Sequence, residues 1–426
     1  MTDLSRRHFA RLLAVTGSAA FWPHVATNLV FTPLPPTPRE PDEAFWKAVR
    51  ARFILPADLC FLNAANLCPT SAPVLEALER NTRYLDGNPS SASRARLTEG
   101  REESRRLIAD ALRVTPEEIV ITRNTSEANN LVSSGLRLGA GDEVLVFGDN
   151  HPSNLEAWRQ KGARFGFTVV EVPATNPHPG AAHYLDAFAR ALTPRTRVLA
   201  MTHVTNTMGD LLPMAELCAL ARARDVRTMV DGAQSFGVLD VHLQEMGPDF
   251  YSGSLHKWPC GPKETGVLFV HRAVHDRIAP SVVSLYAGAV GISRTLEAYG
   301  QRDEAALATV GAAMKFQSDI GRAVIETRVR QLARRLADEL RGIDGVTLRT
   351  DPDPERSAAI VVFQPGGHDP RRFASALYER HRIACASTGG AARPGVRLSP
   401  HFYNTMDELE RTLAAIRTYM SAGLPG

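Results

Sequence analysis

Residues 228–270 read TMVDGAQSFGVLDVHLQEMGPDFYSGSLHKWPCGPKETGVLFV and contain three short apolar runs, at 228–231, 250–252 and 266–270. Polar, glycine-containing turns separate these runs, a pattern that predicts three β-strands. Asp231 ends the first run, and Lys257 follows the second run after a Ser/Gly/His turn. The segment therefore predicts two neighbouring strand ends, one carrying an acid and the other a lysine.

The alternation of strands and helices continues upstream of this segment. Further strands are expected at 119–122, 143–147, 168–172 and 198–203, with helices at 127–136, 154–161, 185–192 and 214–223. Such alternation is typical of a mostly parallel sheet that helices cover on both faces. We therefore predict an α/β fold with a mostly parallel seven-stranded sheet in a large domain of residues 60–304.

The pattern changes after residue 305. A long helix is expected at 305–340, broken near Gly321. It is followed by strands at 346–349, 359–363 and 382–386 and by helices at 371–381 and 406–420. Together with residues 42–59, this part predicts a smaller α+β domain of residues 305–426.

The charge balance narrows the classes of partner. The 426 residues include 49 Lys and Arg against 46 Asp and Glu, a formal net charge of +3, and the excess is spread along the chain. Because no block of basic residues appears, a nucleic-acid partner is not expected.

The cysteines do not predict a metal site. There are five, Cys60, Cys68, Cys218, Cys260 and Cys385, and they form no CxxC pair and no spacing typical of zinc. Most are expected to be buried free thiols. A Cys60–Cys68 disulfide stays open as an alternative if the protein is exported.

The N-terminus has the features of an export signal. Arg6 and Arg7 precede Phe9 and a mainly apolar run that ends near Pro23, which resembles a twin-arginine signal. This run is too short to span a bilayer, so no stable membrane anchor is expected. Five prolines in residues 32–41 predict an extended linker. We expect periplasmic export of the protein, with residues 1–41 as signal and linker; a basic helix start in a cytoplasmic protein is the alternative.

Polar groups follow five of the predicted strands. Thr125 and Ser126 open a helix after the strand at 119–122, His151 follows the strand at 143–147, and Asn206 follows the strand at 198–203. Asp231 and Lys257 are the polar groups at the ends of the remaining two strands. Because ligands gather at the carboxyl ends of parallel strands, these groups are expected in one site.

This set of groups matches the needs of pyridoxal 5′-phosphate (PLP). Lys257 offers the amine for a Schiff base, Asp231 a carboxylate that keeps the pyridine nitrogen protonated, and the helix start at Thr125 amides and hydroxyls for phosphate. His151 is expected to stack on the ring and Asn206 to bond the phenolic oxygen. The expected cofactor contacts are Thr125, Ser126, His151, Asn206, Asp231, Gln234, Ser254, His256 and Lys257.

Over residues 45–420 the chain resembles the class V aminotransferase family of fold type I PLP-dependent enzymes. The segments Leu255-His-Lys-Trp258, with Pro262-Lys263 after it, and Gly300-Gln-Arg-Asp303 are most similar to the isopenicillin N epimerase-like branch. There the second segment reaches the phosphate of the neighbouring subunit. The resemblance thus implies a homodimer in which Gln301, where the family usually has threonine, contacts the cofactor.

The resemblance also implies two substrate contacts. Arg397 begins a segment that ends in Tyr403-Asn-Thr405, as in the family, and would bind the substrate α-carboxylate. Asn66 ends a segment similar to the family's N-terminal active-site strand and would face the substrate. Cysteine desulfurases of the family carry a thiol just before the arginine segment; here Cys385 comes too early, which disfavours that activity.

We therefore expect a PLP-dependent enzyme that acts at the α-carbon or amino group of an amino acid or an amino-acid-containing metabolite. Lys257 would be the base at the α-carbon, in an epimerase-like or aminotransferase reaction, with Asp231 and His151 as further catalytic groups. The alternative is a PLP-dependent lyase or decarboxylase that tailors a secreted metabolite of siderophore or peptide type. A non-catalytic PLP-fold protein is disfavoured, because such a protein would need no arginine to bind a substrate carboxylate. A nicotinamide-dependent oxidoreductase is also disfavoured, because no GxGxxG motif follows the first predicted strand of this chain.

Overall fold

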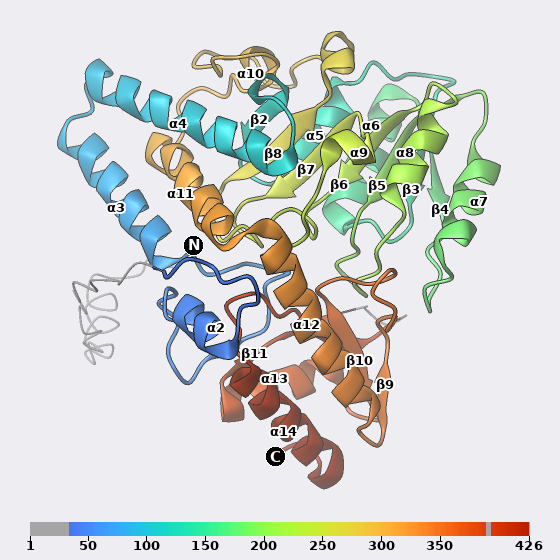
Figure 1. Ribbon diagram of the computed structural model, residues 1–426. Helices are drawn as coiled ribbons and strands as arrows, with labels where there is room; N and C mark the ends of the chain where they lie inside the picture. The colour runs from blue at the N-terminus through green and yellow to red at the C-terminus, as the bar shows by residue number, and fades with distance from the viewer. Residues whose placement is uncertain (1–33, 389–392, 426) are drawn as a thin grey trace, which may run out of the picture. The chain divides into compact units, whose positions relative to one another are not determined.

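The structure is a computed structural model that describes residues 34–388 and 393–425 (Figure 1). The expected twin-arginine segment lies outside these residues. The proposed division of the body into a large and a small domain remains a prediction, and the two sheets are treated in turn below.

The central sheet has seven strands, in the order β2-β8-β7-β6-β5-β3-β4. Four neighbouring pairs are parallel, whereas β8 runs antiparallel to both β7 and β2. The strands are β2 (Ile119–Thr122), β3 (Glu143–Phe147), β4 (Thr168–Val172), β5 (Thr196–Thr202), β6 (Arg227–Asp231), β7 (Phe250–Ser254) and β8 (Gly266–Val270). This confirms the predicted mostly parallel seven-stranded sheet.

Except at the edge strand β4, where only Val172 is buried, both faces of this sheet are buried, which explains why its strands are almost uninterrupted apolar runs. Along β3, Val144 and Val146 belong to one hydrophobic cluster, and Leu145 and Phe147 belong to another on the opposite face. The covering helices are α5 (Thr125–Gly135), α6 (Pro152–Phe165), α7 (Ala181–Ala191), α8 (Met214–Arg222) and the short α9 (Leu243–Met246). The strand ends are thus fixed by packing on two sides.

Two long helices, α3 (Ala72–Gly87) and α4 (Ser91–Leu112), were not predicted from the sequence. Both pack against α11 (Glu304–Ile320). The buried face of α4 includes Ser104 and Arg105, and Arg105 forms an ion pair with the buried Glu297 at 2.5 Å. Polar residues on the buried face hide the helical period that sequence analysis relies on.

The second sheet has four antiparallel strands, in the order β12-β13-β10-β9. Its strands are β9 (Val346–Leu348), β10 (Val361–Pro365), β12 (Ala386–Thr388) and β13 (Gly395–Leu398). The accompanying helices are α12 (Arg322–Arg341), α13 (Pro370–His381) and α14 (Met406–Ala422). Gly321, at φ 96°, separates α11 from α12 as predicted.

The single strand expected at 382–386 is not found, and the prediction is corrected here. The segment is divided at Cys385, because β11 (Ile383–Ala384) pairs in parallel with β1 (Cys60–Phe61) whereas β12 pairs with β13. The remaining elements are α2 (Glu43–Arg50), α10 (Ser293–Leu296) and two short 3₁₀ turns, Pro116–Glu118 and Arg272–Arg277.

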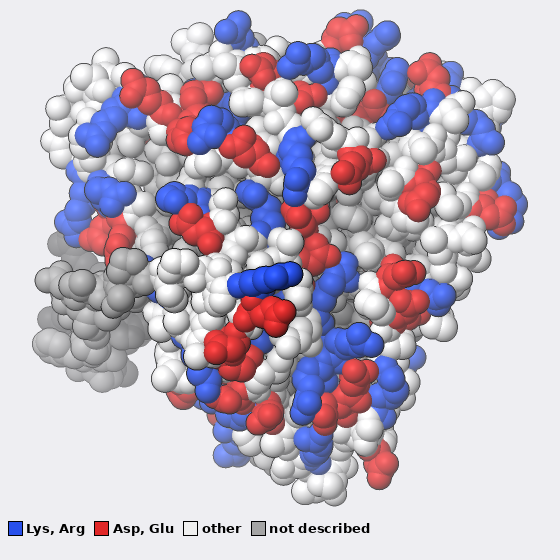
Figure 2. Space-filling model, in the orientation of Figure 1, with Lys and Arg blue, Asp and Glu red and all other residues white. Residues whose placement is uncertain are grey.

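The charged residues do not separate by sign on the face that Figure 2 shows. Lys and Arg side chains lie interspersed with Asp and Glu side chains over this face. This mixing agrees with the absence of a basic block in the sequence. Among the described residues, no helix combines the length and apolar character needed to cross a bilayer.

Candidate functional site

Lys257 lies in the turn that follows β7, and its backbone carbonyl accepts the amide hydrogen of Cys260 at 2.9 Å. Within residues 34–388 and 393–425, its ammonium group makes no hydrogen bond and no ion pair. Burial lowers the pKa of Lys257; the Asp231 carboxylate opposes this shift, and the Arg397 cation adds to it. A buried amine with a lowered pKa is a nucleophile at neutral pH.

Asp231 ends β6, beside β7, and is 3% exposed. Its Oδ1 accepts the amide hydrogen of Ala233 at 3.0 Å, and its Oδ2 accepts hydrogen bonds from the side-chain amides of Asn129 at 2.9 Å and Asn154 at 3.4 Å. Ser252 donates in turn to Oδ1 of Asn129 at 2.8 Å. These neutral donors hold the carboxylate in one orientation without neutralising its charge.

Asn129 was not proposed from the sequence. It lies on the buried face of α5 and is fully buried. A polar side chain on a buried helical face needs a partner in the core, and this requirement is the signal that could have indicated Asn129.

His151 caps the N-terminus of α6. Its Nδ1 accepts the amide hydrogen of Ser153 at 3.2 Å and lies 2.8 Å from the Ser153 hydroxyl. Burial lowers the pKa of His151; Lys257 and Arg397 lower it further, and Asp231 opposes them. At neutral pH the ring is therefore uncharged, with its proton on Nε2.

The start of α5 brings together the groups expected to bind phosphate. The amide of Thr125 donates to the Ser254 hydroxyl at 3.0 Å, and the two hydroxyls are 2.8 Å apart. The Ser126 hydroxyl donates to that of Ser153 at 3.1 Å. A helix N-terminus lined with hydroxyls is a ready site for an anion.

His256 lies on the same turn as Lys257. Burial is the largest cause that lowers the pKa of His256 to about 4, with Lys257 and Lys263 adding to it. Its buried Nδ1 has no hydrogen-bond partner among the described atoms. The ring is thus a neutral group with an unused acceptor.

Arg397 lies on β13 and is 8% exposed. It donates to the backbone carbonyl of Asn206 at 2.8 Å and to Oδ1 of Asn63 at 3.2 Å, whereas its buried Nε has no partner in the described part of the chain. Burial lowers the pKa of Arg397 to about 10, so the guanidinium remains charged at neutral pH. It is therefore a positioned cation with a donor left for a ligand.

Two further residues that were proposed from the sequence, Asn66 and Gln234, differ from expectation in their exposure or their contacts. The contact to Arg397 from the N-terminal segment comes from Asn63, which was not proposed, while Asn66 is exposed. The buried Gln234 donates to the carbonyl of Ala65 at 2.9 Å and accepts from the indole of Trp258 at 2.8 Å. It therefore braces the turn around Lys257.

Gln301 is exposed and lines a cavity of about 570 Å³. Arg123 and Tyr299 also line this cavity, together with Arg302. The cavity lies beside the C-terminal end of β2, because Arg123 directly follows this strand.

The Cys60–Cys68 disulfide considered from the sequence is not present, because both residues are free thiols in different surroundings. The thiol of Cys60 contacts Thr412 at 3.5 Å, whereas that of Cys68 points to the carbonyl of Ala64 at 3.6 Å. Burial raises the pKa of Cys385 to about 12, which makes it a poor nucleophile.

Comparison with known proteins gives consistent matches. The family described as Aminotransferase class-V matches residues 60–412. The chain is 32% identical to an isopenicillin N epimerase of Streptomyces clavuligerus over 401 residues, 88% of this chain and 98% of the relative. It is 31% identical to a probable cysteine desulfurase of Xylella fastidiosa (strain Temecula1) over 411 residues, 89% and 96% of the two chains.

A solved structure of C-DES, with glycine covalently linked to its PLP cofactor, matches with a TM-score of 0.80 and 26% identity. It covers 89% of this chain and 99% of that one.

The residues described above fit this cofactor. The turn holds an amine that has no partner in the described part of the chain, a buried carboxylate lies at the neighbouring strand end, and the start of α5 supplies hydroxyls. The unpartnered Nδ1 of His256 and Nε of Arg397 are buried polar atoms that a ligand would satisfy.

Proposed function

The chain belongs to the class V aminotransferase family and is a PLP-dependent enzyme, and on that premise we propose that it breaks and re-forms the Cα–H bond of an amino-acid-like substrate. When bound, PLP supplies an electron sink for the pair left at the α-carbon. The observation that carries the proposal is the common electrostatic neighbourhood of Lys257, Asp231, Arg397 and His151. Asp231 and Arg397 alter the pKa of both Lys257 and His151, and Lys257 also lowers that of His151.

Arg397 is proposed to bind the substrate α-carboxylate. Its side chain is fixed by the carbonyl of Asn206 and by Asn63, and it retains an unused Nε donor. Holding the carboxylate at one end leaves the α-carbon directed towards the sheet edge that carries Lys257. The pair therefore positions substrate before any proton moves.

Lys257 is proposed to accept the α-proton. Its lowered pKa increases the fraction of the amine that is unprotonated at neutral pH. Asp231, buried and held by neutral amides, would keep a proton on the pyridine nitrogen opposite. With the cofactor bound, Asp231 would hold the ring nitrogen while Lys257 would act as the base at the α-carbon.

His151 is proposed to pack against the ring face and to exchange protons there. Its neutral form, with the proton on Nε2, offers a donor that inversion at the α-carbon would need. An epimerase-like outcome follows if a proton returns to the α-carbon from the other face. An aminotransferase outcome follows if the proton goes to the cofactor.

Sulfur transfer to an enzyme thiol is not proposed. The thiol nearest in sequence to Arg397 is Cys385, whose pKa is raised by burial, and no other cysteine occurs between Cys385 and Arg397. The similarity to desulfurases is therefore taken as similarity of fold and cofactor site.

A homodimer is proposed for the assembly. Val283 and Leu285 are 85% and 74% exposed in the segment that precedes Gln301, which leaves apolar surface beside the proposed cofactor loop. Sedimentation at several concentrations tests the assembly, and a strictly monomeric active enzyme would exclude it. Periplasmic export likewise remains a proposal.

The reaction is tested by incubating the holoenzyme with L- and D-amino acids in D₂O. We expect deuterium at the α-carbon of a substrate, detected by NMR, with chirality and oxo acid measured in the same samples. Inverted product without oxo acid identifies an epimerase, and oxo acid identifies an aminotransferase. Loss of a substituent or CO₂ without α-deuteration of the recovered amino acid would contradict the proposal.

A further inference from the structure

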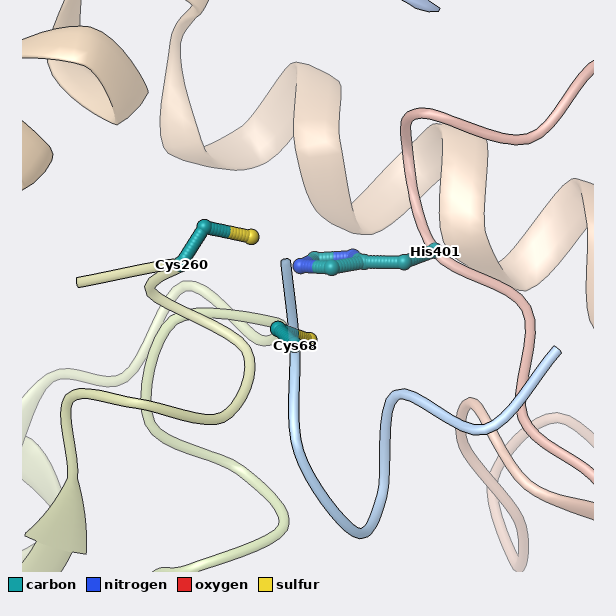
Figure 3. A group of neighbouring side chains, drawn as sticks. All are labelled: Cys68, Cys260 and His401. Carbon is teal, nitrogen blue, oxygen red and sulfur yellow. The ribbon is translucent and has the colours of Figure 1, made fainter. Parts of the chain in front are cut away.

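Three buried side chains from distant segments converge behind the Lys257 turn (Figure 3). Cys68 follows β1, Cys260 belongs to the turn itself, and His401 follows β13. The two sulfurs and one imidazole nitrogen all lie within 4.8 Å of one another, and the residues are at most 1% exposed. In Figure 3 the ring of His401 points between the two cysteines.

These separations are close to those of a metal coordination shell. Tetrahedral zinc with Zn–S bonds of about 2.3 Å and a Zn–N bond of about 2.0–2.1 Å holds its sulfurs about 3.8 Å apart and a sulfur and nitrogen about 3.5 Å apart. From separations of up to 4.8 Å, the sulfur pair would thus have to close by at most about 1.0 Å and a sulfur–nitrogen pair by at most about 1.3 Å.

A second observation points to a missing ligand. His401 Nε2 lies 2.6 Å from the carbonyl of Trp258, so it carries the ring proton, and the buried Nδ1 is left without a partner among the described atoms. The buried hydroxyl of Tyr403 lies next to Cys68 and makes no hydrogen bond of ordinary geometry to any described residue.

The charges favour a divalent ion. Two thiolates formed on binding would neutralise Zn²⁺ and leave no net charge in the core. Carboxylates, the preferred ligands of harder cations, are absent from the cluster.

We infer that Cys68, Cys260 and His401 bind a structural Zn²⁺ ion, with Tyr403 as a candidate fourth ligand. The site would fix the Lys257 turn, because Cys68 donates its amide hydrogen to the carbonyl of His256 at 3.0 Å and Cys260 donates to that of Lys257 at 2.9 Å. It would also tie that turn to the segment that follows Arg397. The inference does not depend on the reaction proposed above.

The first test is metal analysis of the full-length holoenzyme produced in zinc-supplemented medium. We expect about one zinc per chain, and X-ray absorption with two sulfur ligands at about 2.3 Å and a nitrogen ligand at about 2.0 Å. This measurement uses the wild type and so does not depend on whether a variant folds. A folded wild type with its cofactor and no zinc would overturn the inference.

Matched cysteine variants give the second test. Cys68→Ser and Cys260→Ser should lose the zinc and lower the midpoint of thermal unfolding, whereas Cys218→Ser, a buried cysteine on α8 outside the cluster, should keep it. Zinc content unchanged in Cys68→Ser, or a Cys68–Cys260 disulfide in the intact mass of the wild type, would contradict the inference.

Discussion

The two ends of the candidate site are built in different ways. At the Lys257 end, the functional groups follow consecutive strands of one sheet, and each lies within a few residues of a buried strand. At the Arg397 end, one guanidinium is held by residues from two other segments of the chain, through Asn63 and the carbonyl of Asn206. A functional residue that directly follows a strand can be predicted from the sequence, because the strand itself is predictable. A contact between residues from distant segments cannot be predicted in this way.

The largest effect is expected at the Lys257 end. Lys257→Ala removes the amine that attaches the cofactor and accepts the α-proton, so kcat/KM should fall by at least about 10³-fold. The visible absorption of the lysine-bound cofactor should disappear. Lys315→Ala, which changes an exposed lysine paired with Asp319, serves as the control and should keep both signals.

Asp231→Asn tests the charge at the ring nitrogen. The change keeps the shape of the side chain and removes its negative charge, so kcat/KM should fall by about 10²-fold with little change in cofactor content. Stopped-flow measurement of substrate turnover gives the rate. Wild-type turnover in this variant would show that the carboxylate does not serve the ring.

At the Arg397 end, Arg397→Lys keeps a positive charge but loses the planar fork that contacts Asn63 and the Asn206 carbonyl. We expect KM to rise about tenfold with a smaller change in kcat. Initial rates over a range of substrate concentrations separate the two constants. An unchanged KM would show that the substrate α-carboxylate does not bind to Arg397.

A pair of asparagine variants sharpens the comparison. Asn63→Ala removes the side-chain acceptor of Arg397 and should raise KM about fivefold, whereas Asn66→Ala, at an exposed position, should leave KM within about twofold. The opposite ranking would support the sequence expectation that Asn66 is the residue that faces the substrate.

The smallest effect is a shift in pH dependence. The Arg397 cation lowers the pKa of Lys257, so Arg397→Gln should raise it. Because only the unprotonated amine binds the aldehyde, the rate of cofactor uptake falls as pH falls through this pKa. The acidic limb of that profile should therefore move to higher pH in Arg397→Gln. A shift to lower pH would contradict this electrostatic coupling.

Most strands of the central sheet, which carries the proposed cofactor site, were predicted from the sequence. The bounds of β2, β3, β4 and β8 were predicted residue for residue, because each is a run of mainly apolar and β-branched residues between turns. The sequence did not predict α3 and α4, whose buried faces include Ser104 and Arg105. Nor did it predict Asn129, because the need for a buried amide arises only once β6 and α5 are packed together.

The other failures share a cause. Asn63 and the cluster of Cys68, Cys260 and His401 depend on contacts between residues about 140 to 340 positions apart, which no spacing motif records. The strand expected at 382–386 is divided because its two halves pair with strands from different parts of the chain. Long-range pairing overrode local propensity at each of these places.

The most direct test of the account is the identity of the lysine that carries the cofactor. Borohydride reduction of the holoenzyme makes the lysine–cofactor bond permanent, and peptide mass mapping then locates it among the five lysines, Lys47, Lys161, Lys257, Lys263 and Lys315. The account predicts the modification on Lys257 alone. Modification of another lysine, or of none, would contradict it.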